Sequence, residues 1–192
     1  VVDAEGNRVA ATLSINLPFG SGFTAAGTGV LLNNEMDDFS AKPGEPNAYG
    51  LVGDESNAIA PGKRPLSSMS PSMLESPDSI AVLGTPGGSR IISMVFLGTL
   101  EYLQGKPVED WVSRPRFHHQ YLPDEVQYER GGLNDSEQEQ LRARGHTLRE
   151  ISRNYGNMHA ILWQRAAGVV KAASDPRGEG EAQVWHCSWH CV

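Results

Sequence analysis

Cysteine is almost absent from this sequence of 192 residues, which contains only Cys187 and Cys191, close to its C-terminus. The body of the chain therefore cannot hold a disulfide framework, and its cysteine content does not indicate a redox compartment. The tail from Trp185 to Cys191 combines two histidines with two cysteines, a ligand set that suits zinc, although its spacing is unlike that of zinc fingers. We interpret residues 181–192 as a C-terminal tail of non-native or variable origin, and we assign the chain no metal site.

Basic clusters and long apolar runs are also missing. The formal net charge is −7 and lysine and arginine do not cluster, so the chain lacks the basic face that nucleic-acid binding requires. The longest apolar-rich stretch, residues 91–103, is interrupted by polar residues and is shorter than the ~20 residues that cross a bilayer, so we expect no membrane span. The sequence opens at Val1 with neither a signal peptide nor an initiator methionine, and we therefore expect a processed or truncated product.

Several familiar motifs are absent as well. The sequence has no Gly-x-Ser-x-Gly turn for a nucleophilic serine, and it has no glycine-rich nucleotide pattern, so a nucleotide cofactor is not implied. His118 and His119 are neighbours and would point in different directions on a strand or a helix. We interpret them as two structural histidines and not as one site.

What the sequence does contain is enough apolar residues for one domain with a core, since 39% of the chain is hydrophobic. Hydrophobic periodicity predicts both strands and helices, and it places Ile91, Ile92, Val95, Phe96 and Leu100 in the core. The strands are expected at residues 9–16, 29–34, 79–83, 125–129, 159–164 and 169–173, and the helices at 90–104, 107–112 and 135–144. This order of elements predicts an α+β fold with stacked layers.

Residues 33–70 show no hydrophobic period and contain four prolines. A segment of this length without secondary structure is uncommon in a compact domain and is usually either functional or disordered. Apolar residues such as Met36, Tyr49 and Ile59 are scattered through it and argue against disorder. We predict an ordered loop that forms part of a site and packs on its own apolar side chains.

Two pairs of residues near this loop are suited to bind an anion. The hydroxyls of Ser67 and Ser68 lie near its end, and Gly87 and Gly88 immediately precede a predicted helix. Backbone N–H groups of such a glycine turn can face a carboxylate, a phosphate or a developing oxyanion. The plainer alternative is a serine-rich turn followed by a tight strand–helix connection.

Three acids lie at the start of the same loop. Glu35, Asp37 and Asp38 could hold an ammonium group through charge-assisted hydrogen bonds. The alternative is an acidic turn that is simply solvated.

Taken together, these segments resemble the small, C-terminal subunit of the γ-glutamyltranspeptidases, which belong to the N-terminal nucleophile hydrolases. Two of the matching motifs are Lys63-Arg64-Pro65-Leu66-Ser67-Ser68-Met69-Ser70-Pro71 and Pro86-Gly87-Gly88-Ser89-Arg90. The others are residues 1–3, 19–22, 31–44, 115–120 and 173–177. Seven blocks in family order make this resemblance highly specific.

The resemblance implies a four-layer αββα sandwich that is completed by a large subunit cut from the same precursor, with residues 1–180 forming the small-subunit domain. It implies that γ-glutamyl amides, such as glutathione, are cleaved by an N-terminal threonine whose own amine acts as base. The γ-glutamyl group then passes to water or to an acceptor amino acid or peptide, without a cofactor, in a periplasmic or secreted enzyme. The family's threonine precedes the Val1 position, so we expect the nucleophile outside the numbered sequence and do not assign its role to Thr12.

The resemblance also assigns site residues. Catalytic roles fall to Gly87 and Gly88, which match the glycines of the oxyanion hole, and to Ser14, which matches a threonine that hydrogen-bonds the nucleophile. The arginine that pairs with the substrate α-carboxylate belongs to the large subunit. The residues that match the binding site for the α-amino and α-carboxyl groups are Asn16, Glu35, Asp38, Ser67 and Ser68.

Two further hypotheses stay open at this point. A cephalosporin acylase of the same family would keep the nucleophile and the oxyanion hole but would change the acyl pocket. The acids at Glu35 and Asp38 favour a γ-glutamyl group, because an acyl group without an ammonium would leave them unpaired. The other hypothesis is an inactive, truncated chain that serves only in binding or assembly.

Overall fold

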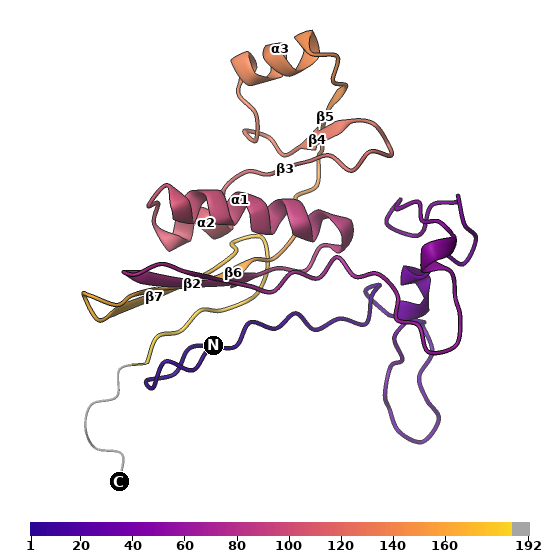
Figure 1. The fold of residues 1–192 in the computed structure, drawn as a ribbon, viewed down its shortest axis with the longest axis horizontal. Helices are drawn as coiled ribbons and strands as arrows, with labels where there is room; N and C mark the ends of the chain where they lie inside the picture. Colours follow the sequence, from indigo (N-terminus) through magenta and orange to yellow (C-terminus); the bar gives the residue numbers. More distant parts are fainter. Residues whose placement is uncertain (186–192) are drawn as a thin grey trace.

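A computed structural model describes residues 1–185, and its centre is a four-stranded antiparallel sheet. The sheet contains β1 (Ser72–Glu75), β2 (Ser79–Gly84), β6 (His159–Gln164) and β7 (Val169–Ser174), in the order β1-β2-β6-β7. Two helices, α1 (Ile91–Leu103) and α2 (Val108–Ser113), cover one face of this sheet (Figure 1). The main core lies between the two layers and includes Leu83, Met94, Trp111 and Met158.

The stripe of buried apolar side chains that α1 turns toward this core is narrower than the sequence predicted. Ile91 and Val95 are buried as expected, but Ile92 and Phe96 are more than half exposed. Residues four apart share one face of a helix, so Ile92 and Phe96 lie together on the face that turns away from the sheet. The prediction that these two residues belong to the core was wrong.

A smaller sheet lies on the far side of α1 from the main sheet (Figure 1). It contains β3 (Phe117–His118), β4 (Val126–Tyr128) and β5 (Leu148–Glu150), with β4 between the other two strands. The helix α3 (Asp135–Ala143) packs beside it and begins with a capping box between Asn134 and Glu137. Val126, Tyr128 and Leu133 form a second small core there.

The N-terminal segment runs along the face of the main sheet opposite α1 and α2 (Figure 1). The strands expected at residues 9–16 and 29–34 do not form, and only isolated bridges such as Val2–Arg8 and Thr24–Leu31 are present there. The alternation that predicted the first strand needs a partner strand and a covering layer. Within the described chain it has neither, since 93% of Leu13 and 59% of Val9 are exposed.

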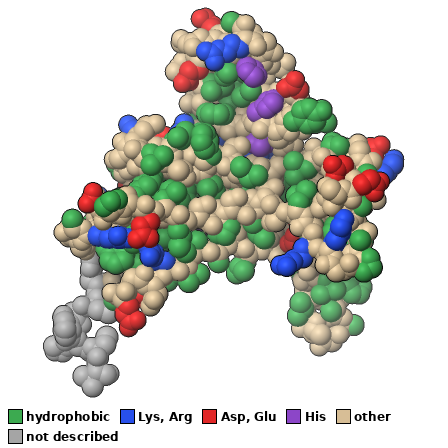
Figure 2. All heavy atoms as spheres, in the orientation of Figure 1, with side chains coloured by type: hydrophobic (Ala, Val, Ile, Leu, Met, Phe, Trp, Pro, Cys, Tyr) green, Lys and Arg blue, Asp and Glu red, His purple; other side chains and the backbone are tan. Residues whose placement is uncertain are grey.

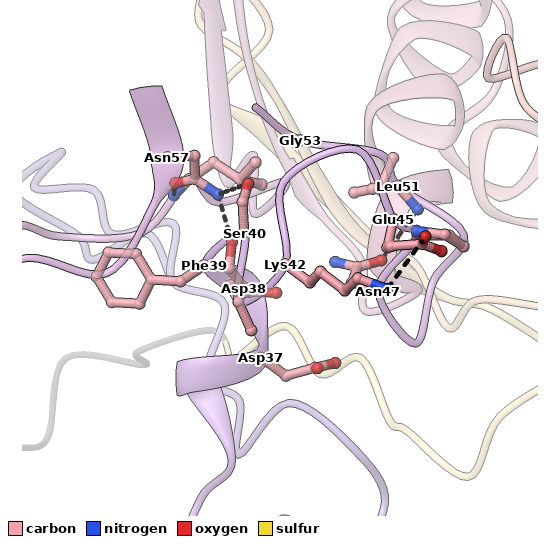
Figure 3. Close-up of a pocket in the computed structure, with 13 residues that line it drawn as sticks. Asp37, Asp38, Phe39, Ser40, Lys42, Glu45, Asn47, Leu51, Gly53 and Asn57 are labelled. Atoms are coloured by element: carbon pink, nitrogen blue, oxygen red, sulfur yellow. Dashed lines mark hydrogen bonds and ion pairs between the residues drawn. The ribbon is translucent and has the colours of Figure 1, made fainter. Parts of the chain in front are cut away.

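Residues 33–70 form a folded loop with two short 3₁₀ helices, η1 (Glu35–Asp38) and η2 (Glu55–Asn57). Hydrogen bonds hold it together: the Asn57 side chain donates to the Asp38 carbonyl at 2.8 Å and to Ser40 Oγ at 3.4 Å (Figure 3). These groups line a cavity of about 120 Å³. The predicted packing on apolar side chains is largely wrong, because Met36 and Ile59 are exposed and Phe39 is the buried apolar residue of the loop.

The α+β class is confirmed, as are the expected helices and the strands at 79–83, 125–129, 159–164 and 169–173. The strands β1, β3 and β5 were not predicted. Of the four layers in the expected sandwich, residues 1–185 supply one sheet and the helical layer on it. No helix in this part of the chain has the length and apolarity needed to cross a bilayer.

Candidate functional site

The candidate site is a hollow of about 1180 Å³ between the loop of residues 33–70, the start of α1 and the segment that follows β5. It brings together every residue to which the family resemblance gave a catalytic or binding role. These residues are Ser14, Asn16, Glu35, Asp38, Ser67, Ser68, Gly87 and Gly88. Asp37, in contrast, lines the separate, smaller cavity of the loop.

The glycine turn stands between the buried strand β2 and α1. Gly87 has φ of +150° and Gly88 has φ of +58°, both in the region that favours glycine. A Cβ on Gly87 would lie 2.4 Å from Met94 Cε, and one on Gly88 would lie 2.4 Å from the Tyr49 ring. Within residues 1–185, neither glycine N–H donates a hydrogen bond to another group. The turn therefore presents two free donors at the start of a helix, where negative charge is favoured.

The acidic part of the hollow comes from η1. Burial raises the pKa of the Asp38 carboxyl, and the negative charge of nearby Glu35 raises it further. The Tyr49 hydroxyl has a raised pKa for related reasons, first burial and then the charge of Asp38. Two carboxylates that repel each other in a partly buried position gain from a cation between them, such as an ammonium group.

Asn16 is held in a left-handed conformation, with φ of +70°, at the edge of the hollow. Its backbone N–H donates to Ser14 Oγ at 2.7 Å, and its side-chain amide donates to the Asn34 carbonyl at 3.1 Å. Its own carbonyl accepts a hydrogen bond from the Tyr49 hydroxyl at 2.9 Å. Ser14 and Asn16 are thus linked to each other, and Tyr49 joins them to the long loop.

The two serines lie where the long loop leads into β1. Ser67 is exposed and Ser68 is half-buried, and both line the hollow. Ser67 Oγ accepts a hydrogen bond from the Met69 N–H at 3.2 Å, so its own hydroxyl hydrogen remains available to an acceptor. This arrangement suits a carboxylate.

Sequence reasoning missed several residues of the hollow. Tyr49 lies against Gly88, and Arg153 and Arg177 also line the hollow. Arg177 carries no free charge, because it pairs with Asp175 at 3.0 Å and with Glu129 at 2.8 Å. Arg177 lies in the matching block of residues 173–177, and Tyr49 lies in the loop of residues 33–70. Neither the block nor the loop indicated a role for these two side chains.

The described residues offer little to a metal ion. Residues 1–185 contain no group of three histidine, cysteine or acidic side chains that could hold one. Cys187 and Cys191, the cysteines of the tail, lie outside the described residues. His118 and His119 point to different partners, since His118 contacts Ser93 and Gln120 whereas His119 contacts Asp124.

The chain is similar to proteins of one family over its whole described length. The family model for gamma-glutamyltranspeptidase matches residues 1–185. The chain is 48% identical to a glutathione hydrolase proenzyme of Pseudomonas aeruginosa over 189 residues, which cover 96% of this chain and 33% of that protein. It therefore spans about a third of the length of that protein and of the glutathione hydrolase proenzyme of Escherichia coli.

Solved structures show the same relationship. A gamma-glutamyltranspeptidase chain from Pseudomonas nitroreducens, complexed with L-DON, has 45% identity and a TM-score of 0.86, with 97% of each chain covered. A cephalosporin acylase from Bacillus halodurans has a TM-score of 0.71 at 21% identity, over 91% of this chain and 31% of that one, which is a likeness of fold alone. By its family model and by these relatives, this chain belongs to the gamma-glutamyltranspeptidase family.

Proposed function

We propose that the protein containing this chain cleaves γ-glutamyl amide bonds, as in glutathione, and passes the γ-glutamyl group to water or to an acceptor amino acid or peptide. The observation that carries the proposal is the single hollow that joins the acids, the serines and the glycine turn. The acids suit an α-ammonium group, the serines suit an α-carboxylate, and the glycine turn suits a developing oxyanion.

The reaction follows from the chemistry of these groups. A threonine hydroxyl at the N-terminus of the processed chain attacks the γ-carbonyl carbon and gives its proton to its own α-amine. The N–H groups of Gly87 and Gly88 stabilise the oxyanion that forms. The amide C–N bond then breaks, the departing amine takes the proton, and a γ-glutamyl ester remains. Water or an acceptor amine attacks this ester and releases the threonine.

The acids distinguish this activity from that of an acylase. Glu35 and Asp38 would face the α-ammonium of a glutamyl group, and Ser67 and Ser68 would bind its α-carboxylate, with Asn16 beside both. An acyl chain without an ammonium would leave the Glu35–Asp38 pair desolvated without a counter-ion, which is unfavourable. Ser14, whose Oγ accepts a hydrogen bond from the Asn16 N–H, would hydrogen-bond the nucleophile.

The rest of the proposed enzyme lies outside this chain. A large subunit from the same precursor would supply the second pair of layers, and residues 1–180 would form the small-subunit domain, with 181–192 as a separate tail. The name of the Pseudomonas aeruginosa relative, a proenzyme, supports a precursor that is processed. A periplasmic or secreted location belongs to the same proposal.

The test uses the complete protein and a γ-glutamyl anilide whose released aniline is measured by absorbance. Ser67→Ala and Ser68→Ala each remove a hydrogen bond to a charged group, so each should raise KM by roughly tenfold or more. Gly88→Ala displaces a turn donor and should lower kcat by about 10²–10³. Within residues 1–185 the Ser113 hydroxyl contacts only the Glu109 carbonyl on α2, so Ser113→Ala is the matched control and should behave like the unsubstituted enzyme.

The outcomes separate the three hypotheses. Glutarylamide cleavage without γ-glutamyl cleavage would favour an acylase. A protein that binds glutamate but cleaves neither substrate would favour a binding or assembly role.

A further inference from the structure

Gln120 lies just beyond β3, and its side-chain amide reaches two parts of the candidate site. Its Oε1 accepts a hydrogen bond from Ser89 Oγ at 2.6 Å, and its Nε2 donates to the Tyr49 carbonyl at 3.0 Å. Ser89 directly follows Gly88 in the chain, and the Tyr49 ring lies against Gly88. The Gln120 side chain therefore anchors both Ser89, the next residue in the chain after Gly88, and Tyr49, whose ring packs against Gly88.

The orientation of this amide is fixed by four hydrogen bonds. Oε1 also lies 2.8 Å from His118 Nε2, and Nε2 of Gln120 also donates to the Leu122 carbonyl at 3.0 Å. A flipped amide would direct its oxygen at the carbonyl oxygens of Tyr49 and Leu122, which can only accept, so only one orientation is possible.

The same logic assigns the tautomer of His118. Because Gln120 Oε1 can only accept, His118 donates through Nε2–H, and its Nδ1 accepts from Ser93 Oγ at 2.7 Å. His118 is buried, with 5% of it exposed, and burial lowers the pKa of its ring, which agrees with the neutral form. Ser93 on α1, His118 on β3 and Gln120 thus form a satisfied polar network, the kind that gives a site rigidity.

We propose that Gln120 is a positioning residue for the reaction: it holds Tyr49 and Ser89 so that the Gly87 and Gly88 N–H groups keep the orientation that receives an oxyanion. Gln120 is not among the residues that line the hollow, so it acts through its neighbours and not on the substrate. This inference rests on the proposed function. It matters because a displacement of about 1 Å at a reacting centre can cost 10²-fold in rate.

Two substitutions cut the two connections separately. Gln120→Glu keeps an oxygen for Ser89 and His118, but it places a second oxygen against the carbonyls of Tyr49 and Leu122 and so breaks the link to the loop. Ser89→Ala removes only a hydroxyl and breaks the link to the turn. Each should lower kcat for the γ-glutamyl anilide by about ten- to a hundredfold, with KM changed less than about threefold.

The control is His119→Gln, because His119 points away from this network and pairs with Asp124 at 2.8 Å. It should leave kcat unchanged. Thermal unfolding of each variant separates positioning from folding, and Ser89→Ala decides the matter if Gln120→Glu does not fold.

Each remaining outcome is decisive. Variants that fold and retain the kcat of the unsubstituted enzyme would overturn the inference and leave the proposed function intact. A lower unfolding temperature with unchanged kcat per folded molecule would make Gln120 a structural residue only, which also overturns it. An unsubstituted protein without γ-glutamyl activity would reject the proposed function and this inference together.

Discussion

At the scale of single residues, Asp38 lies where its ionised carboxylate lowers the stability of the protein without a ligand. Asp38 has a pKa that burial and the charge of Glu35 hold above the usual range of an aspartate. A group whose pKa is raised in the folded state binds its proton more tightly there than in the unfolded chain. As pH rises from the ordinary aspartate pKa through the raised pKa of Asp38, ionisation of Asp38 therefore lowers the free energy of unfolding. A bound ammonium group would reverse that effect.

Asp38→Asn tests this argument, because asparagine keeps the shape but never ionises. The variant should bind γ-glutamyl substrates at least tenfold more weakly, as expected when a charged hydrogen bond is lost. Its free energy of unfolding at pH 7 should equal or exceed that of the parent protein, and the difference should shrink as pH falls through the raised pKa of Asp38 and vanish below about pH 4, the ordinary aspartate pKa. Denaturant titrations at several pH values and steady-state kinetics measure both quantities. A variant that is clearly less stable at pH 7 would contradict this account.

Sequence reasoning was strong at this scale where a residue's chemistry is distinctive. The glycines at 87 and 88 and the acids at 35 and 38 could be singled out because few residue types perform those tasks, and they do meet in one hollow. Gln120 could not be found, since nothing in a glutamine's immediate sequence indicates that Ser89, His118 and Tyr49 will converge on it.

At the scale of elements, a buried cluster of charges joins parts of the two sheets. Arg116 precedes β3 and Asp175 follows β7, and their side chains form an ion pair that is almost completely buried. Arg177 links Asp175 to Glu129, which follows β4. Burial alone would raise the pKa of Asp175, but the Arg177 N–H and the Arg116 guanidinium outweigh it, and the pKa is lowered.

Asp175→Asn should therefore be strongly destabilising. It leaves the buried Arg116 charge without its partner, and breaking such a pair costs about 3–5 kcal/mol. A lowered folded pKa contributes stability above the unfolded value, about 3.9, and loses it as pH falls through the folded value. The gap between parent and variant should thus be full at pH 7 and should narrow below about pH 4.

The control for this prediction is Glu75→Gln. Glu75 also pairs with two arginines, Arg8 and Arg165, but its side chain is 53% exposed, so the loss should be no more than about 1 kcal/mol. Urea unfolding at pH 7 compares the two variants. Equal losses would show that burial does not set the strength of the Asp175 cluster.

Strands were predictable from the sequence where their run of apolar residues is long, as in β2, β6 and β7, which have six residues each. The strands β6 and β7 form a hairpin and β2 lies beside β6, so each of these apolar segments has a partner strand and helices that cover it. The short strands β3 and β5 pair with β4 over two or three residues, which is too little for a period to be seen. The segment of residues 9–16 carries the alternation of a strand, but the described chain supplies no strand to pair with it.

At the scale of the whole molecule, the described chain leaves apolar surface without cover. Hydrophobic side chains are exposed over several parts of the face shown in Figure 2. Val9, Leu13, Phe19 and Phe23 of the N-terminal segment are each more than half exposed. Surfaces of this kind commonly mark an interface with another chain. The proposed large subunit would cover them.

Backbone N–H groups of the same N-terminal segment are available to pair with another strand. Within residues 1–185, the N–H groups of residues 10–15 donate no hydrogen bond, so this stretch resembles the open edge of a sheet. If the rest of the proposed enzyme pairs with it, these amides should exchange with solvent at least a hundredfold more slowly than in an unstructured peptide, because exchange then requires local opening.

Hydrogen exchange followed by mass spectrometry on the complete, processed protein measures this directly, and two internal standards calibrate it. The buried strand β2 should be protected in any case, and the exposed hairpin turn at Ala166 and Ala167 should exchange quickly. Exchange of residues 10–15 as fast as at that turn would mean that no other part of the protein pairs with this segment. The large subunit would then have to complete the molecule at another surface, and the exposed apolar residues from Val9 to Phe23 would need a different partner.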